Sequence, residues 1–174
     1  MPSTKQPRRL SPAKQFAAIE RISIMGITER MGPLALQLYA ENYLSAAKAL
    51  PEPTVPFEPV RSYLVCHAIE LGLKAFLSLQ GKQMVNLAEG QYAHKLGSIL
   101  TAAEEAGLSK LVSFTDFQVE EIRIAETYYA GKVFEYPAVG EALSGYPSRP
   151  TLSHLIEAAT LLVEKLAKPC REAK

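Results

Sequence analysis

The chain has 174 residues, of which 48% are hydrophobic, and it carries 19 Lys and Arg against 18 Asp and Glu. The apolar content excludes intrinsic disorder for most of the chain, and the near-zero net charge excludes a generically cationic nucleic-acid binder. The length fits one domain with its own core. Ala and Leu are abundant and Asp116 is the only aspartate, a composition that favours helices over sheets.

The first 14 residues differ in charge from the rest of the chain. They contain four basic residues and no acid, whereas the remaining residues carry 15 basic against 18 acidic side chains. We predict a flexible basic tail at 1–14, one helical domain at 15–168 and a short C-terminal tail at 169–174. The basic tail is interpreted as a solvated segment, with a phosphate-seeking arm as the alternative. It lacks the apolar stretch of a secretory signal, so no export signal is expected.

Two helices are predicted in the first half of the domain. Apolar residues recur at helical spacing over 33–50, with Pro33 suited to a first helical turn, and this helix ends at Pro51. A proline-rich connector leads to a second helix over 60–79, which stops before Gly81. This second helix is apolar almost all round, which indicates a central helix covered by its neighbours.

Three further helices follow in the second half. The spacing predicts a helix over 94–106, one from Thr115 and Asp116 towards Tyr128, and a last one over 151–167. The segment 131–150 is rich in Gly and Pro and is expected to be irregular. Together the segments predict an all-α, up-and-down bundle of about five helices.

The cysteines and the hydropathy indicate where in the cell the protein is expected. Cys66 lies in an apolar run and is expected to be buried, whereas Cys170 falls in the predicted tail. Two such distant cysteines do not form a disulfide framework, which fits a reducing cytoplasm. No uncharged apolar run is long enough for a transmembrane helix, because charged or polar residues interrupt the segment 63–79.

The second helix contains the most informative pattern, His67-Ala-Ile-Glu-Leu-Gly-Leu-Lys74. Glu70 and Lys74 have the spacing and order of a helical ion pair. One interpretation is a structural pair at the edge of the core. The other places both residues in a polar cleft with His94, where they would bind a phosphate or a ribose.

The succession of motifs resembles the HEPN domain family, the helical nucleotide-binding or ribonuclease-like proteins of prokaryotic defence and toxin systems. The matching segments span roughly residues 35–165. They are Tyr39-Ala-Glu-Asn-Tyr-Leu-Ser-Ala-Ala47, Ala68-Ile-Glu-Leu-Gly-Leu-Lys-Ala75 with Gly81, His94-Lys-Leu96, and Tyr128-Tyr129 leading to Phe134-Glu-Tyr-Pro137. The resemblance implies a compact helical bundle, a homodimer, RNA or a nucleotide as ligand, and a cognate antitoxin or nucleotidyltransferase-like partner.

Catalytic members of that family carry an Arg followed after four to six residues by a His, and cut RNA without a metal. Two pairs here have this spacing, Arg61 with His67 and Arg149 with His154. Both lack the Tyr that often stands two positions after the His, and Arg149 precedes a proline that favours an extended conformation. In such a pair, His would act as the general base and Arg would stabilise the phosphate charge. The alternatives are a satisfied core histidine for His67 and ordinary solvation for Arg149 and His154.

Aromatic and basic residues interleave between 128 and 149. Lys132 and Tyr136 are candidates for binding a base or single-stranded nucleic acid, although a loop pinned onto the bundle is the favoured interpretation. Neither a metal nor a cofactor is expected, because the histidines are far apart in sequence and no phosphate-cradling glycine motif occurs.

Three functions stay open at this point. The first is an RNA- or nucleotide-binding module of a defence or toxin-type system. The second is a metal-independent endoribonuclease that uses one of the Arg/His pairs. The third is a structural interaction protein whose polar residues only complete the core.

Overall fold

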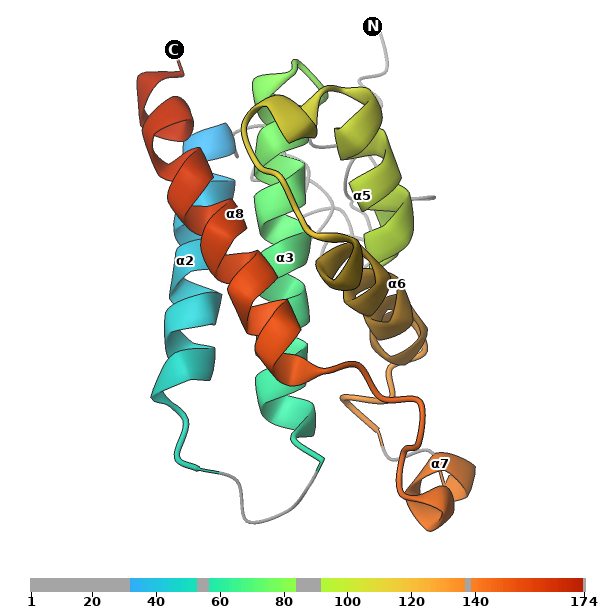
Figure 1. The fold of residues 1–174 in the computed structure, drawn as a ribbon. Helices are drawn as coiled ribbons and strands as arrows, with labels where there is room; N and C mark the ends of the chain where they lie inside the picture. Colours follow the sequence, from blue (N-terminus) through green and yellow to red (C-terminus); the bar gives the residue numbers. More distant parts are fainter. Residues whose placement is uncertain (1–31, 53–56, 84–91, 137–138, 174) are drawn as a thin grey trace, which may run out of the picture. The chain divides into compact units, whose positions relative to one another are not determined.

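The protein is all-α, and five helices pack together in the computed structural model (Figure 1). The structure describes residues 32–52, 57–83, 92–136 and 139–173, and the predicted basic tail at 1–14 lies outside them. The described residues contain no strand. The five helices are α2 (Pro33–Ala49), α3 (Pro59–Leu79), α5 (Leu96–Glu105), α6 (Asp116–Ala130) and α8 (Leu152–Glu172). Two shorter elements are the 3₁₀ turn η2 (Leu108–Lys110) and the helix α7 (Val139–Ser144).

Helix α3 is the central element, as its sequence predicts. It packs against α2, α5, α6 and α8, and in Figure 1 it lies between α2 on one side and α5 with α6 on the other. By length and hydropathy alone α3 could cross a membrane, but 67% of its apolar window is buried inside the bundle. A helix covered by neighbours on all sides is apolar on all sides for that reason.

Local sequence signals account for most helix ends. Both α2 and α3 carry a proline in the first turn, where the missing N–H costs no helical hydrogen bond. Helix α6 begins with a capping box, in which the Thr115 and Gln118 side chains each accept from the other residue's backbone N–H. Gly107 adopts φ +92° directly after α5, a left-handed conformation that glycine reaches without steric cost.

The third helix begins later than predicted, at Leu96 instead of His94. The backbone of His94 has φ +56°, outside the helical region. Lys95 is the N-cap residue. His94 therefore belongs to the segment that leads into α5, and its side chain is not confined to a helix face.

The last helix is longer than predicted and runs to Glu172. Pro169 lies inside it, and the residues predicted to form a C-terminal tail continue the helix as far as Glu172. Leu166 and Cys170 are both fully buried, and their spacing of four places them on one face of α8. The prediction that Cys170 lies in a polar tail is wrong, because this buried face outweighs the proline. Burial raises the pKa of the Cys170 thiol to about 11.

Helices α3 and α8 pack closely together at Gly72. A Cβ atom at this position would lie 2.6 Å from Cδ2 and 3.0 Å from Cγ of the fully buried Leu162. These distances are too short for a packed core to absorb without movement. Gly72 therefore sets how closely the two helices pack.

We predict that Gly72→Ala destabilises the protein through this contact. Overpacking a filled core costs about 1–3 kcal/mol, and a urea denaturation series would measure the loss. Gly140→Ala in α7 is the control, because a Cβ there meets no atom within 4 Å. A Gly72→Ala variant as stable as the wild type would show that Leu162 can move aside.

Candidate functional site

A buried carboxylate organises the most polar part of the interior. Glu70, on α3, is only 2% exposed. Lys74 Nζ donates to its Oε1 at 2.5 Å, and Tyr129 Oη of α6 donates to its Oε2 at 2.6 Å. His94 Nδ1 lies 3.1 Å from the same Oε2. Side chains from two helices and from the segment before α5 therefore converge on one carboxyl group.

His67 joins this group through Tyr129. Its Nδ1 lies 2.6 Å from Tyr129 Oη and 3.5 Å from Glu70 Oε2. Because the Tyr129 hydroxyl donates its proton to Glu70, its oxygen accepts from His67, so Nδ1 of His67 carries a proton. The hydrogen bonds thus run from His67 to Tyr129 to Glu70.

The same reasoning assigns the tautomer of His94. An ionised carboxylate only accepts hydrogen bonds, so His94 Nδ1 donates to Glu70. When the two rings are neutral, Nε2 of both His67 and His94 keeps a free lone pair. Orientation of an imidazole by a carboxylate, leaving the other nitrogen free, is the arrangement that general bases use.

The network keeps Glu70 ionised. Burial alone would raise the pKa of this carboxyl group, but the His67 imidazole 3.5 Å away, the charge and hydrogen bond of Lys74 and the hydrogen bond from Tyr129 lower it well below its usual range. Burial and the neighbouring Glu70 charge raise the pKa of Tyr129 far above its usual value. Tyr129 therefore stays protonated and serves as a donor.

Tyrosine rings surround the His67 imidazole. The Tyr43 ring of α2 meets it edge-on at 4.4 Å between centroids, and the Tyr63 ring lies parallel to it at 5.8 Å. The Tyr129 ring meets His94 edge-on at 5.4 Å. We call this group the Glu70 cluster, which consists of Tyr43, Tyr63, His67, Glu70, Lys74, His94 and Tyr129.

The cluster opens to solvent through its histidines. The His94 side chain is 55% exposed and that of His67 is 19% exposed, whereas Glu70 and Lys74 are buried. The anionic and cationic groups therefore lie inside, and the imidazoles stand between them and water. A ligand approaching from solvent would meet the histidines first.

Helix geometry explains part of this assembly. Tyr63, His67, Glu70 and Lys74 follow one another at spacings of three and four along α3, which places them on one face of the helix. The structure brings Lys74 and His94 against Glu70, and a role for the three in binding a ligand stays a prediction. Sequence reasoning missed Tyr129 as a partner of Glu70. The only signal for this residue was its position in a stretch rich in tyrosine.

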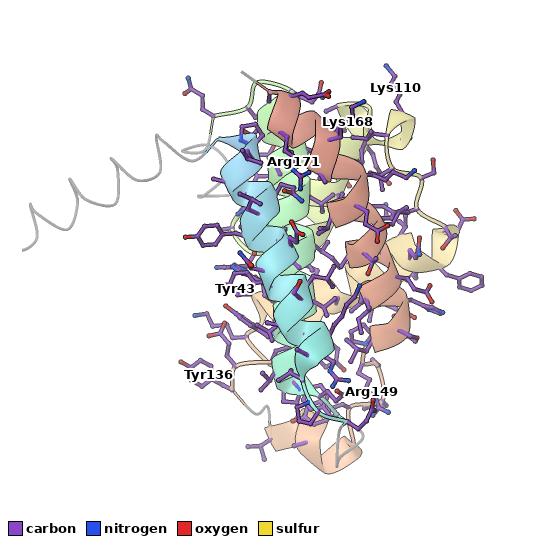
Figure 2. The ribbon with its side chains drawn as sticks, turned by 90° about the vertical axis from the view of Figure 1, so that its left-hand side faces the viewer. Tyr43, Lys110, Tyr136, Arg149, Lys168 and Arg171 are labelled. Carbon is purple, nitrogen blue, oxygen red and sulfur yellow. The ribbon has the colours of Figure 1, made fainter. Side chains whose placement is uncertain are left out.

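Lys132 and Tyr136, the other predicted ligand-binding residues, lie in the turn that follows α6. Both are exposed, and Lys132 adopts a left-handed φ of +58°. Figure 2 places Tyr136 towards the same edge of the bundle as Tyr43. Neither contacts Glu70 among the interactions of the described residues, and a role for them in binding stays a prediction.

The Arg61/His67 pair is not assembled as a site. The Arg61 guanidinium donates to the backbone oxygens of Leu50 and Pro51 and lies 3.0 Å from Glu58 Oε2. It therefore clamps the chain that leaves α2 onto the beginning of α3. His67, six residues further along, is oriented by Tyr129 instead.

The Arg149/His154 pair also has separate partners. Arg149 is exposed and donates to the backbone oxygen of Gly145 at 3.4 Å. His154 Nδ1 lies 3.6 Å from Glu121 Oε1, too far for a hydrogen bond. A catalytic role for this pair stays a prediction.

No family model, curated protein or solved structure matches this chain. Within the part of the chain that the structure describes, no group of three or more His, Cys, Asp or Glu side chains is arranged to hold a metal ion. The residues of the Glu70 cluster are therefore the basis for any chemistry inferred for this site.

We predict that Glu70→Gln is strongly destabilising, because it leaves the buried Lys74 ammonium without a counter-ion. Breaking a buried pair from one side costs about 3–5 kcal/mol at neutral pH. The folded-state pKa of Glu70 is lowered, so the wild-type stabilisation is complete above the unfolded pKa of about 4.3 and is lost as the pH falls below it. The stability difference between wild type and variant should therefore shrink in acid.

Urea denaturation at several pH values, from about pH 7 down to about pH 3, would measure this difference. Glu164→Gln, an exposed position on α8, is the matched control and should change the stability little. A difference between wild type and Glu70→Gln that stays constant in acid would contradict an ionised Glu70 in the folded protein.

Proposed function

We propose that this chain is a HEPN-like RNA- or nucleotide-binding protein of a prokaryotic defence or toxin-type system, and that its ligand binds at the Glu70 cluster. The observation that carries this proposal is the orientation of two solvent-facing imidazoles by one buried carboxylate, beside tyrosine rings. The all-α architecture agrees with the family resemblance. The same proposal includes a homodimer and an antitoxin or nucleotidyltransferase-like partner, both of which rest on that resemblance. It also includes a cytoplasmic location, which rests on the two unpaired cysteines.

The charges of the cluster suit a phosphate once an imidazole is protonated. Glu70 and Lys74 neutralise each other at 2.5 Å, so a proton on His94 or His67 gives the cluster a net positive charge. Histidine as a class changes charge between about pH 5 and pH 8. A nucleotide phosphate would accept from the exposed His94, and a base would stack on the aromatic rings near His67.

We predict that a short fluorescent RNA or a nucleotide binds the full chain. His94→Ala should weaken binding about tenfold or more, because a charge-assisted hydrogen bond to phosphate is worth about 1.5–3 kcal/mol. Fluorescence anisotropy would measure the dissociation constants.

His154→Ala is the matched control, because His154 is partly exposed but faces Glu121 of α6 and not Glu70. It should bind as the wild type does. If His94→Ala and His154→Ala lower the affinity equally, or if neither changes it, the ligand binds elsewhere on the protein.

A second function, metal-independent endoribonuclease activity, is favoured by one further observation. Two histidines with oriented Nδ1 atoms offer Nε2 as a base and, when protonated, as an acid. One imidazole would take the proton of a ribose 2′-hydroxyl as its oxygen attacks the phosphorus. The other would give a proton to the departing 5′-oxygen, leaving a 2′,3′-cyclic phosphate. The Arg149/His154 pair remains the alternative catalytic pair.

We predict that labelled RNA is cleaved in excess chelator, and that His67→Ala and His94→Ala each lower the rate by about two orders of magnitude. Gel analysis of the fragment ends would show the cyclic phosphate. Loss of activity in His154→Ala alone would assign the chemistry to the Arg149 pair. Intact RNA with every protein, the wild type included, would leave binding as the function.

A further inference from the structure

A cavity of about 300 Å³ opens where α8 begins, and it shares no residue with the Glu70 cluster. Its wall includes Phe57 and Ser62 on one side and Arg149, Thr151 and Leu152 on the other. This volume is at the lower end of the range for small-molecule sites. The cavity is therefore large enough for a small ligand.

The Ser62 hydroxyl is available to a ligand in this cavity. Ser62 is only 6% exposed, it lines the cavity, and no hydrogen bond of its side chain occurs among the described residues. A ligand with an acceptor or donor atom in the cavity would satisfy this hydroxyl.

Arg149 and the start of α8 contribute hydrogen-bond donors to this cavity. Among the described residues, Arg149 makes one side-chain hydrogen bond, at 3.4 Å to a backbone oxygen. Thr151 is the N-cap of the 21-residue helix α8, and it makes no side-chain cap hydrogen bond. The free N–H groups and the dipole at the start of a helix favour an anion.

The acidic groups near the cavity are already engaged. Glu58, which also lines it, pairs with Arg61 at 3.0 Å. Glu121 accepts from the Thr151 backbone N–H at 2.6 Å and faces His154. Neither carboxylate forms an ion pair with Arg149 among the described residues, so its guanidinium is free to bind an added anion.

We propose that this cavity binds a phosphate monoester, with Arg149 and the start of α8 on the phosphate and Ser62 donating to one of its oxygens. Phe57 gives the organic part of the ligand an apolar wall, because its ring is held by stacking on Tyr146 at 3.9 Å. A phosphate oxygen suits all three recognising groups, since each of them donates hydrogen bonds. The site shares no residue with the Glu70 cluster, although its Arg149 is also the arginine of the alternative catalytic pair.

Isothermal titration calorimetry on the full chain tests this site with three probes: inorganic phosphate, ribose 5-phosphate and ribose. Inorganic phosphate and the sugar phosphate should bind, the latter more tightly, and ribose should not. Ribose phosphate carries no base, so stacking at the Glu70 cluster does not contribute. His94→Ala should therefore bind ribose 5-phosphate as the wild type does.

The decisive variants are Arg149→Gln and Ser62→Ala. We expect Arg149→Gln to lower the affinity for ribose 5-phosphate at least about tenfold and Ser62→Ala to lower it a fewfold, with unchanged circular dichroism spectra. Arg171→Gln is the matched control, because Arg171 lies at the other end of α8 (Figure 2) and is equally exposed to solvent.

The proposal is overturned if Arg149→Gln binds as tightly as the wild type, or if Arg171→Gln weakens binding equally. Equal binding of ribose and ribose 5-phosphate, or no binding of either phosphate probe, overturns it too. Partial recovery of affinity in Arg149→Lys supports it, because a lysine restores the charge without the planar fork.

Discussion

The buried carboxylate of Glu70 is the constraint on which the rest of the interior depends. An ionised group that is almost fully withdrawn from water is tolerated only when hydrogen bonds and an opposite charge replace its hydration. Here Lys74 supplies the charge, and Tyr129 and His94 supply hydrogen bonds from α6 and from the segment before α5. Each of these elements has to be in place before Glu70 can be ionised inside the bundle.

The helices could be predicted from the sequence because their signals are local. The apolar pattern of α3, the prolines that open α2 and α3 and the capping residues of α6 lie within a few positions of the elements they define. The ends that were missed depend on tertiary contacts. Burial of Cys170 carries α8 past Pro169, and the left-handed backbone of His94 delays the start of α5.

The candidate site could be predicted only in part. Glu70 and Lys74 follow from their spacing on one helix, and His94 follows from the order of the motifs. Tyr129 is 59 residues from Glu70, and no local rule pairs them. The Arg/His spacing is a local pattern too, yet each arginine is directed to other partners because the chain beside it offers backbone oxygens.

One carboxylate oxygen serves two histidines. Oε2 of Glu70 lies 3.1 Å from His94 Nδ1 and 3.5 Å from His67 Nδ1, so both rings draw on the same negative charge. Any movement of the Glu70 carboxyl group therefore displaces the contacts of both imidazoles together. One side chain of the central helix thus fixes the spacing of the two polar groups that a ligand would meet first.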